Sequence, residues 1–389
     1  MCARRIDKPR YEIAGKLEKF NEADNVQARG ELLPDSELWQ AYYKNHPELE
    51  SDGRAWLKLP GMGNVGPIAD RLMLASMFST VGLISKDENV DGAPSPEKVE
   101  LMPERAAAKI KGFARHLGAD LVGIGPLNQA WVYSHVGRAH YPDQTIGMEI
   151  KLPHKSAIVV AVHLNRDMLR CAPEMPSVIE IIKTYQRLAV IAVTLAQYIR
   201  LLGYPARAHD IMNYQVLLVP LAIDAGLGEL GRNGVLINEK YGNAIKMAAV
   251  TTDMPLAHDK PVNIGVKEFC KQCRICGEHC PVGAIPIKQE PKVVRGVRKW
   301  KINDAACYRY WRTVGTDCGI CLAVCPWSRP RYFPHNIIQW GVERSALFRN
   351  LAIKADTMLK RKRNPCPSWL EEQPKEWQTE LRTGHPFRC

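Results

Sequence analysis

The pattern of apolar and polar positions changes near residue 103 of this 389-residue chain. Residues 103–120, PERAAAKIKGFARHLGAD, have apolar side chains at helical spacing, a proline in the first turn and a glycine near the end. They predict an amphipathic helix. The apolar run SAIVVAVHL (156–164) has the length of a buried strand. Residues 176–204 are apolar over a much longer stretch and predict a long helix that stops at Gly203.

Three further apolar runs lie between this helix and residue 262. They predict strands or buried helices, and they are VLLVPLAI (216–223), GVLIN (234–238) and KMAAVTT (246–252). Helical and strand-like runs therefore alternate. This alternation favours an α+β or α/β fold for a core that spans residues 103–264.

The segments on either side of this core have a different composition. Residues 1–102 are rich in polar residues, proline and glycine, and we expect short helices and loops that wrap over the core or form a lid. Residues 265–335 are rich in cysteine, and residues 336–389 form a polar extension rich in Trp and Arg. The sequence contains no tandem repeat. The predicted order is thus an N-terminal segment, the core, a cysteine-rich module and a C-terminal extension.

Composition and charge limit the class of protein. Hydrophobic residues make up 46% of the chain and charged residues 24%, a balance typical of a globular protein rather than a disordered one. The formal net charge is +12. Such an excess would suit nucleic acid, an anionic membrane or an acidic protein donor, and charge alone does not choose among them.

Membrane and export signals are not apparent in the sequence. The longest apolar runs are shorter than the roughly 20 residues that cross a bilayer. The pair Arg4-Arg5 is followed by a charged and polar stretch, where an export signal needs an apolar region. We expect a cytoplasmic protein. The alternative is an exported respiratory enzyme whose twin-arginine signal has been removed.

Eight of the twelve cysteines lie within 56 residues. Cys270, Cys273, Cys276 and Cys280, with Pro281 behind them, form the run C-x2-C-x2-C-x3-C-P of bacterial two-cluster ferredoxins. In such ferredoxins the fourth cysteine of each run binds the other cluster. The spacing therefore predicts two [4Fe–4S] clusters.

The second cysteine run is stretched at its front and reads Cys307-x10-Cys318-x2-Cys321-x3-Cys325-Pro326. With the fourth cysteines exchanged, the first cluster takes Cys270, Cys273, Cys276 and Cys325. The second cluster takes Cys307, Cys318, Cys321 and Cys280. Structural zinc is the alternative, because paired CxxC motifs often donate four thiolates to one ion.

The length of the chain points to a further redox centre. An electron carrier needs only a fraction of 389 residues, and the CxxCH motif of covalent haem does not occur. GLGELG (226–231) fits the dinucleotide pattern G-x-G-x-x-G, but Pro220 interrupts the strand that should precede it, and an Asn-Gly turn follows where a helix should begin. We therefore expect this loop, with Gly228 and Gly231, to pack against a different large ligand.

Three stretches carry a resemblance to a known family. They are TYQRLAVIAVTLAQYIRLLGY (184–204), AGLGELGRNGVLINEKYG (225–242) and CYRYWRTVGTDCGICLAVCPWS (307–328). They resemble the cobalamin-dependent reductive dehalogenases, and the likeness runs from about residue 10 to 335. The signature GTDCGIC with VCPWS separates that family from its relative epoxyqueuosine reductase, which acts on transfer RNA and usually carries C-terminal helical repeats. About 55 residues follow the clusters here, too few for three repeats.

The resemblance implies a nitroreductase-like core that holds a base-off corrinoid without a protein ligand to cobalt. It also implies a proton donor, Tyr185 in TYQRLA, and a basic residue, Lys246 in AIKMAAV, whose charge would lower the pKa of the phenol. Asn213 in DIMNYQ is a further active-site candidate, and Arg232 in LGRNG is expected to contact the edge of the corrinoid. The cobalt-ligand motif D-x-H-x-x-G does not occur in the chain.

The sequence thus predicts an enzyme, a corrinoid and iron–sulfur reductive dehalogenase that replaces carbon–halogen by carbon–hydrogen in an organohalide. Its expected partners are the organohalide and an electron donor, either a ferredoxin or flavoprotein or a membrane-linked quinol system with an anchor protein. Nucleic acid is not expected. Two alternatives stay open: an epoxyqueuosine reductase acting on transfer RNA, and a ferredoxin-like electron carrier.

Overall fold

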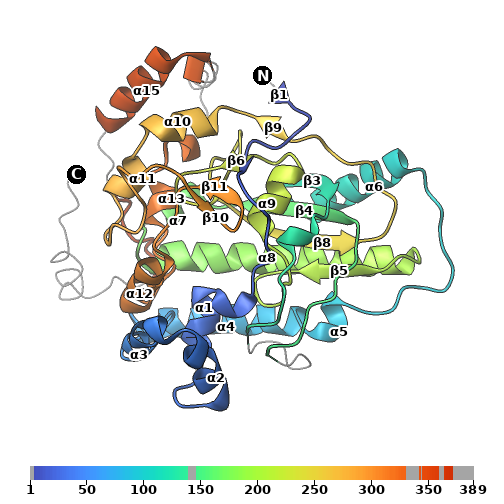
Figure 1. The fold of residues 1–389 in the computed structure, drawn as a ribbon, viewed down its shortest axis with the longest axis horizontal. Coiled ribbons are helices and arrows are strands. Elements are labelled where there is room, and N and C mark those ends of the chain that lie inside the picture. Colours follow the sequence, from blue (N-terminus) through green and yellow to red (C-terminus); the bar gives the residue numbers. More distant parts are fainter. Residues whose placement is uncertain (1–3, 139–145, 330–340, 343, 359–362, 371–389) are drawn as a thin grey trace.

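A four-stranded antiparallel sheet forms the centre of the protein in this computed structural model (Figure 1). The described residues are 4–138, 146–329, 341–342, 344–358 and 363–370. The strands lie in the order β3 (Leu121–Pro126), β4 (Ser156–His163), β8 (Ile245–Thr252) and β5 (Ala206–His209). β4 is buried at every position but its last, which explains why its sequence is apolar throughout and does not alternate. The predicted combination of helices with a sheet is confirmed.

The long helix α8 (Met175–Leu201) lies across β4, β5 and β8 (Figure 1). It has nearly the predicted bounds. Pro176 lies in its first turn, where no amide hydrogen is needed, and Gly203 follows its end with φ of +84°. A Cβ atom at Gly203 would lie 2.3 Å from the carbonyl oxygen of Glu97, so only glycine fits there. The predicted helix α6 (Pro103–His116) shares a hydrophobic core with α8.

The three shorter apolar runs form one helix and parts of two strands. VLLVPLAI contains the helix α9 (Leu218–Asp224), which tolerates Pro220 because the proline lies in the first turn. GVLIN contains β7 (Leu236–Ile237), which pairs with β6 (Glu229–Leu230) in a small hairpin. KMAAVTT lies in the central strand β8. α9 packs on β3 and β4 and joins a second hydrophobic core with Trp131 and Tyr133.

The N-terminal residues form short helices and add strands to later parts of the chain. β1 (Arg4–Arg5) pairs with β9 (Val262–Asn263), and β2 (Glu12–Ile13) pairs with β11 (Val297–Lys299). The helices of this part are α1 (Val26–Glu31), α2 (Glu37–Asn45), α3 (Glu50–Leu57), α4 (Ile68–Ile84) and α5 (Asp87–Val90), with short 3-10 helices at Glu22–Asp24 and Pro47–Leu49. α4 packs against α8, so this part of the chain encloses one side of the core.

The cysteine-rich residues form a compact group of short elements at one end of the molecule (Figure 1). The elements are α10 (Val266–Gln272), α11 (Ile275–Glu278), β10 (Lys292–Val294), β11, α12 (Asp304–Val314), α13 (Ile320–Ala323) and a 3-10 helix at Pro326–Ser328. α11 contacts α13, and α13 contacts the core helix α7 (Arg166–Leu169). Further along the chain, α15 (Ala346–Met358) packs on α10.

A 3-10 helix at Gln129–Trp131 leads into the second hydrophobic core. Within the described residues, none of the helices has the length and apolar character that would let it span a membrane. Residues 330–335 of the cysteine-rich module and residues 336–340, 343, 359–362 and 371–389 of the expected C-terminal extension lie outside the described part of the chain.

Candidate redox site

The eight clustered cysteines gather in two groups. In the first cysteine group, Cys325 lies beside Cys270, Cys273 and Cys276. Burial raises the pKa of the Cys325 thiol well above its ordinary value, and these three thiols raise it further. Burial also raises the pKa of Cys270 to about 12. None of the four forms a disulfide, and a coordinating thiol is deprotonated when a metal binds it.

The second cysteine group comprises Cys280, Cys307, Cys318 and Cys321. Burial is the main cause that raises the pKa of Cys318, and the other three thiols of the group add to it. Burial raises the pKa of Cys307 to about 12 and that of Cys321 to about 11. The two groups coincide with the ligand sets expected from the spacing, including the exchange of Cys280 with a cysteine of the other run.

A single zinc ion would require four ligands around one point. In the part of the chain that the structure describes, no three or more His, Cys, Asp or Glu side chains are arranged to hold one metal ion. Each cysteine group brings four thiols near one another, and four is the number of cysteines that a [4Fe–4S] cluster takes.

The signature GTDCGIC shapes the loop before α13. Cys318 has a left-handed backbone (φ 58°), a conformation that costs roughly 1 kcal/mol for a residue with a side chain. The Thr316 hydroxyl stabilises it by accepting a hydrogen bond of 3.2 Å from the Cys318 amide and donating one of 2.5 Å to the Pro173 carbonyl. Gly319 follows with φ of 72°. The signature therefore fixes the direction in which Cys318 enters the second cysteine group.

Arg232 holds the loop of the first cysteine group. Its guanidinium donates hydrogen bonds to the carbonyl oxygens of Cys270 (2.6 and 2.9 Å), Cys273 (3.2 Å) and Pro286 (2.9 Å), and it lies 4.3 Å from the centre of the Trp300 ring. The side chain is 4% exposed. Burial lowers the pKa of Arg232, and the cysteine thiols oppose this shift. Among the described residues, no carboxylate pairs with Arg232, so its charge faces the cysteines.

A cavity of about 480 Å³ lies next to the second cysteine group. This volume is within the usual range for ligand sites. Its wall combines α8, α9, β8, the β10–β11 hairpin and N-terminal residues. Leu322, the neighbour of Cys321 in the chain, lies on this wall, and so do Gly234 and Val235 of the glycine-rich loop. The cavity wall and the second cysteine group are therefore directly connected through the chain at Cys321 and Leu322.

Tyr185 and Lys246 come together on the cavity wall from α8 and β8. The Lys246 Nζ lies 5.1 Å from the centre of the Tyr185 ring and 3.8 Å from a carboxylate oxygen of Asp317. Asp317 directly precedes Cys318, so this contact joins the cavity wall to the second cysteine group. The side chains of Lys246 and Asp317 are 19% and 10% exposed.

Burial and the neighbouring charges together set the pKa values of Tyr185, Lys246 and Asp317. Burial raises the pKa of Tyr185, and the nearby Lys246 only partly offsets this. The expectation that Lys246 lowers the phenol pKa below its ordinary value is therefore wrong in its net direction, because loss of hydration outweighs the charge. Burial lowers the pKa of Lys246, but Tyr185 and Asp317 outweigh it, so the net pKa is raised. Burial raises the pKa of Asp317, against the effect of Lys246. Tyr185 is thus a protonated phenol at neutral pH.

Two buried polar atoms on the cavity wall, Asp210 Oδ2 and Asn243 Nδ2, have no hydrogen-bond partner among the described residues. An unpaired buried donor or acceptor costs about 1–3 kcal/mol, so such atoms favour a ligand with polar groups at the same place. No histidine lies on this wall within the described part of the chain. The wall therefore fits a large ligand with amide groups and a metal that needs no protein ligand, as a base-off corrinoid does.

The other expected site residues lie elsewhere. Asn213 is buried, and its side-chain amide accepts from Arg207 (2.5 Å) and donates to Asp87 (2.6 Å); it is not on the cavity wall. Gly228 and Gly231 pack against Ile237 of the adjoining strand, where a Cβ would meet its atoms at 2.2 and 2.8 Å. The close approach at these glycines is thus to the protein's own hairpin.

Sequence reasoning missed Asp317, Asn243 and Asp210. Asp317 lies inside the signature GTDCGIC, and a carboxylate next to a cluster ligand could have been matched with the buried lysine. Asn243 and Asp210 follow no recognisable motif. Their importance depends on the cavity, which only the fold reveals.

Comparison with known proteins identifies the cysteine-rich module. Residues 269–329 match the model of the 4Fe-4S dicluster domain. The prediction of two [4Fe–4S] clusters, rather than zinc, is therefore confirmed.

The chain also has curated relatives. It is 32% identical over 277 residues to a tetrachloroethene reductive dehalogenase of Desulfitobacterium hafniense, covering 60% of this chain and 50% of the relative. It is 31% identical over 292 residues to the tetrachloroethene reductive dehalogenase of Sulfurospirillum multivorans, covering 67% and 58%. The chain spans about half the length of the curated relatives it matches. An epoxyqueuosine reductase of Lactococcus garvieae is 27% identical over 126 residues, 28% of this chain and 32% of the relative.

Solved structures agree with these relatives. A reductive dehalogenase described with a mechanism for B12-dependent dehalogenation is 26% identical with a TM-score of 0.76, covering 93% of this chain and 49% of that one. The predicted fold, a mixed helix-and-sheet cobalamin-binding core followed by a two-cluster ferredoxin-like module, is therefore confirmed. The chain is a homologue of the reductive dehalogenases, and epoxyqueuosine reductase is a more distant relation.

Proposed function

We propose that the chain is a corrinoid and iron–sulfur reductive dehalogenase. The observation that carries the proposal is the pair Tyr185 and Lys246 on the wall of a ligand-sized cavity, linked through Asp317 to the second cysteine group. An electron carrier needs no such cavity. The two relatives described above support the same assignment, since both are named for reductive dehalogenation.

The cavity would hold the corrinoid beside the second cluster. Asn243 would donate to an acceptor on its edge, and Asp210 would accept from an amide, because neither atom has a partner among the described residues. The bound corrinoid would supply the two electrons that break the carbon–halogen bond.

Arg232 would act at the first cluster, since its guanidinium hydrogen-bonds the cysteine loop. Asn213 would support the wall indirectly, because its backbone carbonyl accepts a hydrogen bond of 3.0 Å from the Asp210 amide.

Tyr185 would give the proton that completes the carbon–hydrogen bond. The balance of the reaction is one organohalide, two electrons and one proton in, and one product with hydrogen in place of that halogen and one halide out. Burial keeps the phenol protonated at neutral pH. Lys246 would hold the phenol in place. After Tyr185 has given its proton, Lys246 would stabilise the resulting phenolate until a proton from solvent restores the phenol. Trp131, Tyr133 and Phe20 on the same wall would exclude water.

The substrate would be a small organohalide. Curated relatives are named for tetrachloroethene, and one structural neighbour, 25% identical with a TM-score of 0.74, contains 3-bromo-4-hydroxybenzoic acid. The electron donor, a membrane anchor protein and a cytoplasmic location stay predictions from the sequence.

Anaerobic reconstitution with cobalamin tests this function. We expect about eight irons and one corrinoid per chain, and halide release from chlorinated alkenes or brominated phenols with a low-potential dye as reductant. Irons without corrinoid uptake would instead support an electron carrier. Reduction of an epoxyqueuosine-modified transfer RNA stem-loop, with no halide released from any organohalide tested, would support the alternative enzyme.

A further inference from the structure

The cysteine-rich module carries a strong excess of positive charge. Residues 267–301 contain nine lysines and arginines but only three glutamates, so they account for half of the net charge of the whole chain. The nine are Lys267, Lys271, Arg274, Lys288, Lys292, Arg295, Arg298, Lys299 and Lys301. A charge excess this local is a feature of one surface rather than of the composition in general.

Two of these cations are adjacent in the chain to ligands of the first cluster. Lys271 follows Cys270, and Arg274 follows Cys273; both side chains are exposed. No carboxylate pairs with either of them among the described residues. A molecule bound to Lys271 and Arg274 would therefore be separated from the first cluster only by the loop that holds it.

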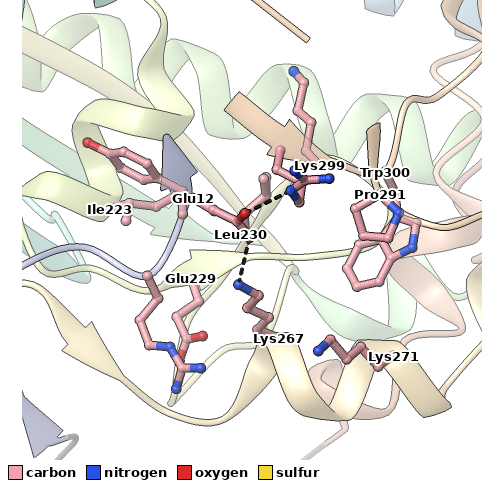
Figure 2. A pocket seen from close by; sticks show the side chains of 12 residues that line it. Glu12, Ile223, Glu229, Leu230, Lys267, Lys271, Pro291, Lys299 and Trp300 are labelled. Atoms are coloured by element: carbon pink, nitrogen blue, oxygen red, sulfur yellow. Dashed lines mark hydrogen bonds and ion pairs between the residues drawn. The ribbon is translucent and has the colours of Figure 1, made fainter. Parts of the chain in front are cut away.

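The positive charge continues onto the neighbouring hairpin. Figure 2 shows Lys267 and Lys271 of α10 and Lys299 of β11 around one small cavity of about 50 Å³. Glu12 is paired there with both Lys267 (3.6 Å) and Arg298 (2.8 Å). Strand β10 places Lys292 opposite Lys299. α10 and the β10–β11 hairpin thus form one face, here called the basic face, with more cations than carboxylates.

The α10 side of the basic face lies at the first cysteine group, whereas the hairpin side, through Arg295 and Lys299, also lines the large cavity. Tyr185 and Lys246 contact the second cysteine group through Asp317, whereas Arg232 and Trp300 join the basic face to the first cysteine group. Burial raises the pKa of Cys276 in the first group, and Cys321 of the second group adds to the shift, so the two groups are neighbours. Electrons that enter at the basic face would pass through the first cluster, then the second, to the cavity.

We propose that the basic face is the docking surface for a small acidic one-electron carrier protein, such as a flavodoxin or ferredoxin. This inference rests on the proposed function for the direction of electron flow, and on the dicluster domain for the entry point. Opposite charges speed the encounter and orient the partner, and weak electron-transfer complexes need only a small interface. A nucleic acid or an anionic membrane would gain nothing from contact with a cluster loop.

The test uses fully reduced flavodoxin as the probe and the reconstituted chain without organohalide. Stopped-flow mixing follows the appearance of blue flavodoxin semiquinone and bleaching of the iron–sulfur absorbance. We expect the second-order rate to fall about tenfold between low and high salt, and about tenfold in Lys271→Glu at low salt. Lys271→Arg should keep the wild-type rate, because it keeps the charge.

Lys109→Glu is the matched control. Lys109 is an exposed lysine on α6, at the other end of the molecule (Figure 1), and its reversal changes net charge equally. Equal slowing by Lys271→Glu and Lys109→Glu, or a rate without salt dependence, would overturn the proposal. Reduction by methyl viologen radical, which needs no docking, reports whether the clusters are intact. If Lys271→Glu loses iron, Lys292→Glu repeats the test from β10, outside the cysteine loops.

Two other outcomes would assign the basic face differently. Loss of corrinoid from Lys271→Glu, with unchanged flavodoxin oxidation, would make the face part of the ligand site. Binding of phosphatidylglycerol vesicles or transfer RNA that Lys271→Glu abolishes, with unchanged flavodoxin oxidation, would make it a membrane or nucleic-acid surface. Because cluster bleaching needs no substrate, a chain that accepts electrons yet releases no halide would remove the proposed function and leave the docking surface standing.

Discussion

The Lys246 Nζ lies 5.1 Å from the centre of the Tyr185 ring, and Lys246 reaches this place from the central strand β8 while Tyr185 comes from the long helix α8. The cation stands beside a ring that is only partly covered by protein and that faces a cavity. A phenol in this setting is held in one orientation, stays protonated and can lose its proton to a ligand in the cavity. Burial lowers the pKa of Lys246, but Tyr185 and Asp317 together outweigh it, so the lysine stays charged.

Replacing the phenol hydroxyl is the direct test of its role. We expect Tyr185→Phe to lower halide release by about 10²–10⁴-fold, the range usual for loss of a positioned proton donor. Corrinoid and iron content should not change, because the ring that packs against the hydrophobic core is kept. Tyr198→Phe, on the same helix but packed against Phe113, is the control and should retain full activity. Equal turnover of Tyr185→Phe and wild type would remove Tyr185 from the mechanism.

The pH dependence follows from the raised pKa of Tyr185. The phenol donates a proton only in its protonated form, and its pKa is raised above the ordinary value of 10.0 because of burial. Single-turnover halide release should therefore stay level from about pH 7 to 9 and decline only above about pH 10, where the phenolate forms. The cation of Lys246 persists over the same interval, since its pKa is also raised. A decline centred near pH 8 that disappears in Tyr185→Phe would contradict this assignment.

The sequence allowed much of the redox path to be predicted, because its signals are local. Cysteine spacing is a property of one loop, so the two clusters could be expected from the spacing alone. α8 could be expected because apolar residues continue over many turns, with Pro176 and Gly203 at its ends. Tyr185 and Lys246 could be named only through the resemblance, since nothing in their surroundings along the chain distinguishes them from other tyrosines and lysines.

What could not be predicted depends on packing between distant segments. Arg232 was expected at the corrinoid, but the fold brings its loop against the carbonyl groups of Cys270 and Cys273 instead of the cavity wall. Asp317 meets Lys246 although 70 residues lie between them. The net pKa shift of Tyr185 depends on how burial compares with a nearby charge, and a sequence contains neither quantity.

Arg232 offers a test of the first cluster alone. Arg232→Met removes hydrogen bonds to four carbonyl groups, those of Cys270, Lys271, Cys273 and Pro286, while keeping an apolar stem beside Trp300. Hydrogen bonds from charged groups contribute about 1.5–3 kcal/mol each, so we expect the first cluster to be lost or labile and iron to fall from about eight to about four per chain. Arg232→Lys should retain part of the iron. The lysine keeps the positive charge, but it lacks the planar set of N–H donors of the guanidinium. Corrinoid bound at wild-type occupancy is expected in both variants, and full iron content in Arg232→Met would show that the loop holds without it.

The exchange of the fourth cysteines can be tested with pairs of substitutions. If Cys325 belongs to the first cluster, Cys325→Ser and Cys270→Ser damage the same four-iron unit, and the double variant loses no more iron than either single one. Cys325→Ser combined with Cys318→Ser should instead damage both units and leave almost no iron. Without the exchange, the two pairs give opposite results, because Cys325 would then share a cluster with Cys318. Iron analysis, with electron paramagnetic resonance of the reduced proteins to count the remaining clusters, separates the two arrangements. The positions of the thiols favour the exchange, since Cys325 lies among the three cysteines of the first run.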